Sequence, residues 1–131
     1  MSKHIGGVWI LISASVVFAL LPIIGNASPI GPITKVVVEE TGIGPKADGC
    51  HSFVLTPNKV RAFFAKAVLI SGRQEHDFFL YGPCSARGTL QSRYGTWHWE
   101  IRNLGTATIT ATNGDVFMLG DPSQESSLAD E

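Results

Sequence analysis

The sequence predicts an α+β domain in which one amphipathic helix packs on a four- or five-stranded, mainly antiparallel sheet, with one disulfide. Three observations lead to this prediction. Residues 57–67 carry apolar side chains at helical spacing, and residues 85–119 alternate between apolar and polar side chains as strands do. The only two cysteines, Cys50 and Cys84, follow an N-terminal segment typical of exported chains.

Residues 1–27 have the plan of a secretory signal peptide. Lys3 precedes an apolar run over residues 5–24, and small residues follow it up to Ala27, where we expect cleavage. The run is also long enough to span a bilayer, so an uncleaved anchor is the alternative. Both interpretations carry the chain after Ala27 out of the cytoplasm, and we expect a periplasmic or secreted location.

The charge balance excludes one class of partner. Cleavage after Ala27 takes 27 of 131 residues and leaves 104, enough for one domain. Loss of Lys3 leaves nine basic residues against eleven acidic ones, a net charge of −2 with neutral histidines. We therefore expect no nucleic-acid partner, and membrane contact only if the N-terminal segment stays uncleaved. The acidic tail, residues 121–131, is expected to be disordered.

The two cysteines predict a cross-link. Thiols of exported chains are oxidised, so a disulfide between Cys50 and Cys84 is expected. Closing this loop of 34 residues stabilises a domain by about 3–4 kcal/mol. The alternative to a disulfide is a catalytic Cys50 that acts as a nucleophile with His51 as its base. Nucleophile and base normally come from separate parts of a fold, which disfavours this alternative. Free or intermolecularly paired cysteines complete the possibilities.

Residues 28–49 form a Pro/Gly-rich N-terminal segment, and we expect the compact α+β domain over residues 50–120. Within the segment, the β-branched run 33–38 predicts an edge strand, and "ETGIGPKADG" after it is interpreted as a loop. Residues 53–55 look like a short strand that leads into the helix.

A helix is predicted from Pro57 to Ala67. Thr56 can cap its N-terminus and Pro57 suits the first helical position. Its apolar residues follow at i, i+3, i+4 and i+7: Val60, Phe63, Phe64 and Ala67. The basic residues elsewhere on it are Lys59, Arg61 and Lys66. We interpret these as a solvated face, with a basic binding surface as the alternative.

The connection between helix and meander is harder to assign. Residues 68–70 fit either a strand or a last helical turn, and "SGRQEHD" is expected to turn at Gly72. The following "FFLYGPC" is too apolar for a free loop, so one of three residues is expected to pack near the disulfide: Phe78, Leu80 or Tyr81.

An antiparallel meander is predicted from Ser85 onward. Ala86, Gly88 and Leu90 alternate with polar residues, and "SRYG" marks a turn. The next strand places Trp97 and Trp99 on one face. We expect these tryptophans in the core, although an exposed pair would suit carbohydrate or a protein partner.

The length of the turn in the last hairpin predicts which residues of its two strands pair. A three-residue loop over residues 112–114 places Ile109 opposite Phe117, with Leu119 on the same apolar face. A two-residue turn would place Met118 there instead. We prefer the first register because it gathers the bulkier side chains and uses the glycine of the loop in a left-handed conformation.

Two pairs of titratable residues could carry chemistry: His76 with Asp77, and His98 with Glu100. A metal site needs three or four converging ligands, and neither pair brings a recognisable third, so we expect no metal and no cofactor. Nor does the chain offer a recognisable nucleophile motif for these histidines to serve, so no catalytic residue is assigned. The weak functional candidates are His76, Asp77, His98, Glu100, Trp97 and Trp99.

The succession "LTPNKVRAFFAKA", "EHDFFLYGPCSARGTL", "WHWEIRNLGTATIT" and "NGDVFML" resembles a group of small exported bacterial proteins with no established activity. The similarity covers about residues 50–120 and implies export and a small α+β domain. The last strand of that group often ends in a cysteine where this chain has Gly120, so the group's cysteine pairing does not carry over directly. The resemblance supplies no catalytic residues.

The functional hypothesis is an exported, non-catalytic interaction or inhibitor-like domain whose partner is an unknown protein or envelope component. One alternative is a small periplasmic hydrolase or metal-dependent enzyme that uses His51, His76 or His98. The other is a structural envelope component anchored in the membrane by its N-terminal segment.

Overall fold

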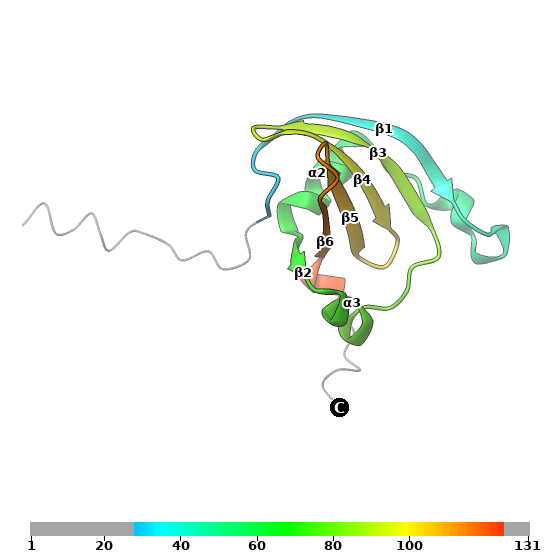
Figure 1. The fold of residues 1–131 in the computed structure, drawn as a ribbon. Helices are drawn as coiled ribbons and strands as arrows, with labels where there is room; N and C mark the ends of the chain where they lie inside the picture. Colours follow the sequence, from blue (N-terminus) through cyan, green and yellow to red (C-terminus); the bar gives the residue numbers. More distant parts are fainter. Residues whose placement is uncertain (1–27, 125–131) are drawn as a thin grey trace, which may run out of the picture.

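The structure is a computed structural model and describes residues 28–124 (Figure 1). The expected signal peptide, residues 1–27, lies outside the described residues, as does the tail over residues 125–131. The described part forms a six-stranded antiparallel sheet of order β1-β3-β4-β5-β6-β2 with two α-helices, so the predicted α+β class is confirmed. The prediction of one helix on four or five strands was low by one helix and by one or two strands.

The strands are β1 (Ile33–Ile43), β2 (Val68–Ile70), β3 (Ser85–Ser92), β4 (Gly95–Arg102), β5 (Thr106–Ala111) and β6 (Val116–Gly120). The α-helices are α2 (Pro57–Lys66) and α3 (Gly72–Phe78). Three short 3-10 helices complete the described chain: η2 (Lys46–Asp48), η3 (Cys50–Ser52) and η4 (Pro122–Gln124).

The predicted edge strand is confirmed and is longer than expected. β1 continues through residues 39–43, part of which was interpreted as loop, and pairs with β3 despite three irregularities in register. Residues 33–43 therefore belong to the same sheet as the domain expected to begin at Cys50. The short strand predicted over residues 53–55 is wrong. Phe53 O accepts from Gly42 N and from the Thr41 hydroxyl, both at 2.8 Å, but no ladder of backbone hydrogen bonds continues from there.

Helix α2 begins where the sequence predicts and ends one residue earlier, at Lys66. The Thr56 hydroxyl accepts a hydrogen bond from Lys59 N at 3.3 Å, Pro57 occupies the first turn, and Ala67 is the C-terminal cap. Val60 and Phe64 are buried against the sheet. In Figure 1 the helix lies behind the strands, with α3 at the lower end of the sheet.

After α2, the strand that the sequence left open for residues 68–70 is observed, whereas the turn predicted at Gly72 is not. Residues 68–70 form β2, which pairs with β6 and closes the second edge of the sheet. Gly72 begins α3 instead of a turn, because Ser71 and Gln74 form a reciprocal capping box: Ser71 Oγ accepts from Gln74 N at 3.1 Å, and Gln74 Oε1 accepts from Ser71 N at 2.8 Å.

The apolar segment after α3 is anchored by a residue that was not predicted. Phe79 is buried and its ring fills the space above Gly120, where a Cβ atom would lie 2.5 Å away. Of the three residues predicted to pack near the disulfide, Leu80 and Tyr81 are 54% and 74% exposed and are not core residues, whereas Phe78 is half-buried. The glycine at the end of β6 thus makes room for an aromatic ring.

The meander follows the predicted pattern. β3 pairs with β4 through a turn at Arg93 and Tyr94, and β5 pairs with β6 so that Ile109 faces Phe117. Ala111 N donates to Asp115 O at 2.8 Å, which closes the predicted three-residue loop. The preferred register is therefore confirmed.

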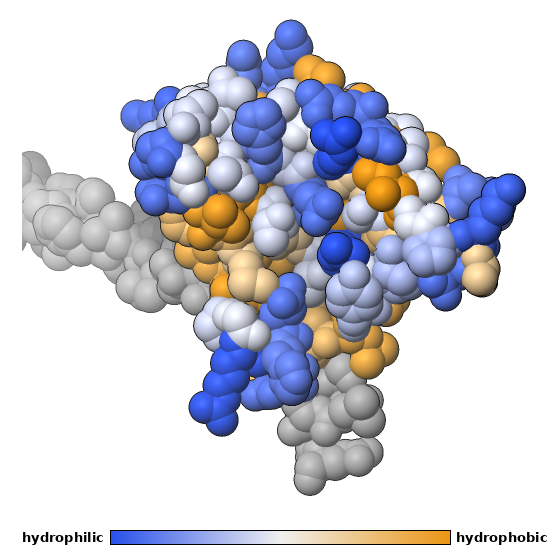
Figure 2. Space-filling view, turned by 45° about the vertical axis from the view of Figure 1, so that its right-hand side comes forward, coloured by the Kyte–Doolittle hydropathy of each residue, from blue (hydrophilic) through white to orange (hydrophobic). Residues whose placement is uncertain are grey.

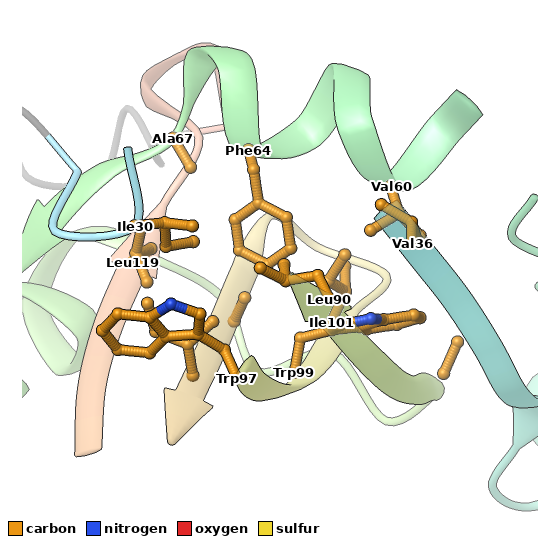
Figure 3. Packing of buried hydrophobic residues seen from close by; sticks show 13 residues of the cluster. Ile30, Val36, Val60, Phe64, Ala67, Leu90, Trp97, Trp99, Ile101 and Leu119 are labelled. Carbon is orange, nitrogen blue, oxygen red and sulfur yellow. The ribbon is translucent and has the colours of Figure 1, made fainter. Parts of the chain in front are cut away.

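The core lies between α2 and one face of the sheet (Figure 3). Trp97 and Trp99 are 6% and 2% exposed, which confirms that they are core residues. The indole Nε1 of Trp99 donates to Thr89 O at 2.9 Å, so the ring is buried with its one polar group satisfied. Figure 3 shows Phe64 of α2 reaching down among these side chains toward Leu90.

The disulfide between Cys50 and Cys84 is present, and both residues are buried. It joins η3, which precedes α2, to the residue before β3. The chain between them forms α2, the edge strand β2 and α3, so the cross-link fastens the two ends of this segment.

Residues 121–124 depart from the expectation of a disordered tail. They form η4 and its approach, where Asp121 N donates to Gly105 O at 2.8 Å. The expectation of disorder for residues 125–131 concerns residues outside the described part of the chain.

Candidate functional site

His98 and Glu100 lie on the open face of the sheet, opposite the tryptophans of the same strand. They border a shallow hollow of about 180 Å³, together with Arg87 of β3. Arg87 is paired with Glu40 at 2.9 Å and more loosely with Glu39 at 3.7 Å. This face is polar and its charges largely satisfy one another.

His76 and Asp77 lie on α3, with side chains 88% and 42% exposed. The imidazole Nδ1 is 3.1 Å from an oxygen of Asp77, and Arg73 Nε donates to the other oxygen at 3.4 Å. The hydrogen bond from His76 lowers the pKa of Asp77, Arg73 adds to this effect, and partial burial opposes it. The pair is an ordinary surface cluster at the outer side of its helix.

The residue of α3 that lies next to the open face of the sheet is Glu75, not His76. Glu75 shares a small hollow of about 20 Å³ with Glu100 and Arg102, whereas His76 is directed to solvent. Within residues 28–124, no group of three or more His, Cys, Asp or Glu side chains is placed to hold a metal ion. His51 is exposed, and its neighbour Cys50 has its sulfur in the disulfide and no thiolate to offer.

A more apolar feature, open to solvent, lies beside α2. It is a groove of about 260 Å³, which we call the α2 groove. The helix contributes Lys59, Ala62, Phe63 and Lys66, which stand at i, i+3, i+4 and i+7 and so share one stripe. The other walls are formed by Phe53, Leu55, Ile101, Arg102, Asn103, Gly105, Asp121 and Gln124.

Local interactions explain why these distant segments meet. The hydroxyl of Thr41 donates to Phe53 O and accepts from Leu55 N at 2.9 Å, which holds the wall that precedes α2. On the opposite side, Gly105 has a φ of 91°, and a Cβ atom there would overlap Gln124. The glycine therefore allows η4 to pack on the turn after β4.

The electrostatics of the α2 groove are asymmetric. Among the described residues, neither Lys59 nor Lys66 forms an ion pair. Arg102 is engaged elsewhere, since its guanidinium lies 4.9 Å from the Tyr81 ring centroid and donates to Gly82 O at 2.9 Å. The helix side of the groove thus presents two ammonium groups beside an apolar floor.

The basic residues of α2 do not form one surface. Arg61 donates to the carbonyl oxygens of Ile33 and Thr34 at 3.1 and 3.4 Å, so it fastens the helix to the start of β1. Lys59 and Lys66 line the groove. The sequence interpretation of a single solvated face missed this division, and the spacing of Lys59, Phe63 and Lys66 was the available signal.

Hydrophobic groups elsewhere on the surface are scattered. On the face shown in Figure 2, hydrophobic residues are exposed at separate places between hydrophilic side chains. The most exposed large ones are Val54, Leu80, Tyr81, Tyr94 and Val116, of which only the neighbours Leu80 and Tyr81 share a loop. Single exposed apolar residues are normal, so these do not define a site.

In residues 28–124, no helix is both long enough and apolar enough to cross a membrane. Comparison with known proteins yields no matching family model, no matching curated protein and no matching solved structure.

Proposed function

We propose that this chain is an exported, non-catalytic interaction module that binds a segment of a partner protein in the α2 groove. The observation that carries the proposal is the groove itself, in which an apolar floor around Phe63 lies beside Lys59 and Lys66. A partner segment that suits it carries an apolar side chain flanked by carboxylates.

The disulfide supports the exported location. Buried cross-links persist in oxidising compartments such as the periplasm or the extracellular medium. It also supports binding over nucleophilic catalysis by Cys50, because a disulfide sulfur is no longer a thiolate. A braced frame positions the groove walls without the binding partner having to order them.

The strength of such an interaction can be bounded. Burying one leucine-sized side chain contributes about 1.5–3 kcal/mol, and each exposed ion pair with Lys59 or Lys66 contributes about 0–1 kcal/mol. A short segment therefore binds with at most about 2–5 kcal/mol, which corresponds to a Kd from about 30 mM down to about 0.2 mM. Tighter binding requires contacts of the partner beyond the groove.

The test uses a short peptide in which one leucine is flanked by aspartates, titrated up to millimolar concentration into the isotope-labelled full chain. We expect saturable NMR shift changes at Phe63 and along α2, weakened by salt. The matched peptide has lysines in place of the aspartates and is expected to bind at least several-fold more weakly.

Charge reversal in the groove supplies the second comparison. The double variant Lys59→Glu with Lys66→Glu is expected to lose most of the affinity for the acidic peptide. The control, Lys35→Glu with Lys46→Glu, changes two exposed lysines outside the groove and is expected to keep it. Equal binding by both double variants, or no preference for the acidic peptide, would overturn the proposal.

A further inference from the structure

We infer that residues 125–131 of this chain occupy the α2 groove, so that the module is held in a self-occupied state that a partner segment must displace. The inference rests on the proposed function, because it assigns to the same groove a competitor within the molecule.

The path of the chain leads into the groove. Asp121 is fastened to Gly105 by its backbone N–H, and η4 then brings Gln124 into the groove wall. The next residue is Glu125. The segment beyond η4 therefore starts at the site without crossing any other part of the described surface.

The chemistry of the segment matches the site. Its sequence, "ESSLADE", carries Leu128 as its one large apolar residue and three carboxylates, those of Glu125, Asp130 and Glu131. The groove offers an apolar floor and the two lysines that have no ion-pair partner among the described residues. Leucine on the floor and carboxylates toward the lysines satisfy both features.

The lengths also agree. Lys59 and Lys66 are seven positions apart on α2, which is about 10 Å along the helix axis. Seven extended residues span up to about 23 Å. The segment can therefore start at Gln124, cross the floor and reach both lysines.

Covalent attachment favours binding of this segment over binding of a free peptide of the same composition. A short tether gives an effective concentration in the millimolar range, which lies within the range of Kd expected for the groove. Where the two are equal, the attached segment fills the groove about half of the time at any protein concentration. An outside segment then binds about twofold more weakly than it would to an empty groove.

The direct test is an NMR measurement on the full chain. We expect nuclear Overhauser effects between the Leu128 methyl groups and the rings of Phe53 and Phe63, which weaken as salt is added. Their intensity per molecule should not change on dilution. Overhauser effects that vanish on dilution would assign the groove to the tail of a second copy, and their absence at every concentration would show the groove empty; either result overturns the inference.

The functional test neutralises the segment within the full chain. The variant combines Leu128→Ser, Glu125→Gln, Asp130→Asn and Glu131→Gln, and we expect it to bind the aspartate-flanked leucine peptide at least about twofold more tightly than the wild type. The control variant, Ser126→Ala with Ser127→Ala, keeps the leucine and the charges and is expected to bind like the wild type.

The outcomes separate the two proposals. Equal peptide affinity for the wild type and the neutralised variant, with both bound in the groove, leaves the binding module intact and overturns self-occupation. Failure of the peptide to bind either protein overturns the proposed function. The Overhauser effects from Leu128 then report on self-occupation by themselves.

Discussion

At the scale of single residues, Gly88 shows how a missing side chain positions a large one. It lies on β3 opposite Trp99, where β1 departs from regular register between Val38 and Glu40. A Cβ atom at this position would overlap the carbonyl oxygen of Val37 and lie 2.8 Å from the indole ring. The glycine thus lets β1 approach closely and lets the ring reach its hydrogen-bond acceptor, Thr89 O.

We expect Gly88→Ala to lower the free energy of unfolding by about 2–3 kcal/mol, because a backbone oxygen and a packed ring must both move. Urea unfolding followed by tryptophan fluorescence measures the change. The matched control is Gly72→Ala at the start of α3, where nothing lies within 4 Å of the added methyl group. The control is expected to be neutral or slightly stabilising, and equal stability of the two variants would contradict the packing described for Gly88.

Asp77 gives a prediction for pH. Its pKa lies below the ordinary value of 3.8, mainly because His76 donates a hydrogen bond to the carboxylate. The stabilisation from this contact is therefore fully present above pH 3.8 and is lost as the pH falls through the lowered folded-state pKa. NMR titration of the Asp77 carboxyl carbon should show the low midpoint, and His76→Ala should raise it. A midpoint unchanged by that substitution would assign the shift to another cause.

At the scale of elements, helix ends are set by local hydrogen bonds whose residues are visible in the sequence. Thr56 caps α2, and the capping box of Ser71 and Gln74 starts α3. The first cap was predicted, because an apolar period follows it. The second was missed, because Gly72 was interpreted as a turn and the seven-residue helix is too short to show a period. The Ser-x-x-Gln spacing alone was the available signal.

Removing the first cap gives a prediction for α2. Thr56→Ala is expected to cost about 1 kcal/mol of stability, because Lys59 N loses its acceptor at the exposed helix start. Thr56→Ser keeps a hydroxyl acceptor and should cost at most a few tenths of that. Thermal unfolding of the two variants measures the difference. Alanine and serine variants of equal stability would show that the hydroxyl contact contributes nothing.

The predictable parts of the fold were those encoded by local pattern. Alternation predicted the buried faces of β3 and β4, and the turn at residues 112–114 predicted the register of β5 with β6. The extension of β1 to Ile43 was not visible, because a glycine-rich sequence is interpreted as loop unless its partner strand is known. Likewise, Lys59 and Lys66 could be placed on one helix stripe, but the wall supplied by η4 depends on a tertiary contact at Gly105.

At the scale of the whole molecule, both edges of the sheet are poor templates for further strands. β2 has only three residues, and β1 is interrupted in register and fastened at its start by Arg61. Short or irregular edges disfavour edge-to-edge pairing. Recognition is therefore expected through side chains in the α2 groove and not through an added strand.

The cross-link ties that groove to the frame. Cys50 stands in η3, directly before the wall formed by Phe53 and Leu55, and its partner Cys84 precedes β3. Gly44 leaves room for the sulfur, since a Cβ atom there would lie 2.6 Å from Cys50 Sγ. Loss of the disulfide should thus act both on overall stability and on this wall.

We expect the double variant Cys50→Ala with Cys84→Ala to lose about 3–4 kcal/mol of unfolding free energy, because the unfolded chain regains the entropy of a loop spanning 34 residues. Under conditions where this variant is still folded, its affinity for the aspartate-flanked leucine peptide should also fall, since the Phe53 wall is less constrained. Urea unfolding and the peptide titration measure the two effects.

The wild-type protein should give no reaction with a thiol reagent until it is unfolded in the presence of a reductant. Prompt labelling of two thiols in the native protein, or a double variant as stable as the wild type, would contradict a structural role for the disulfide.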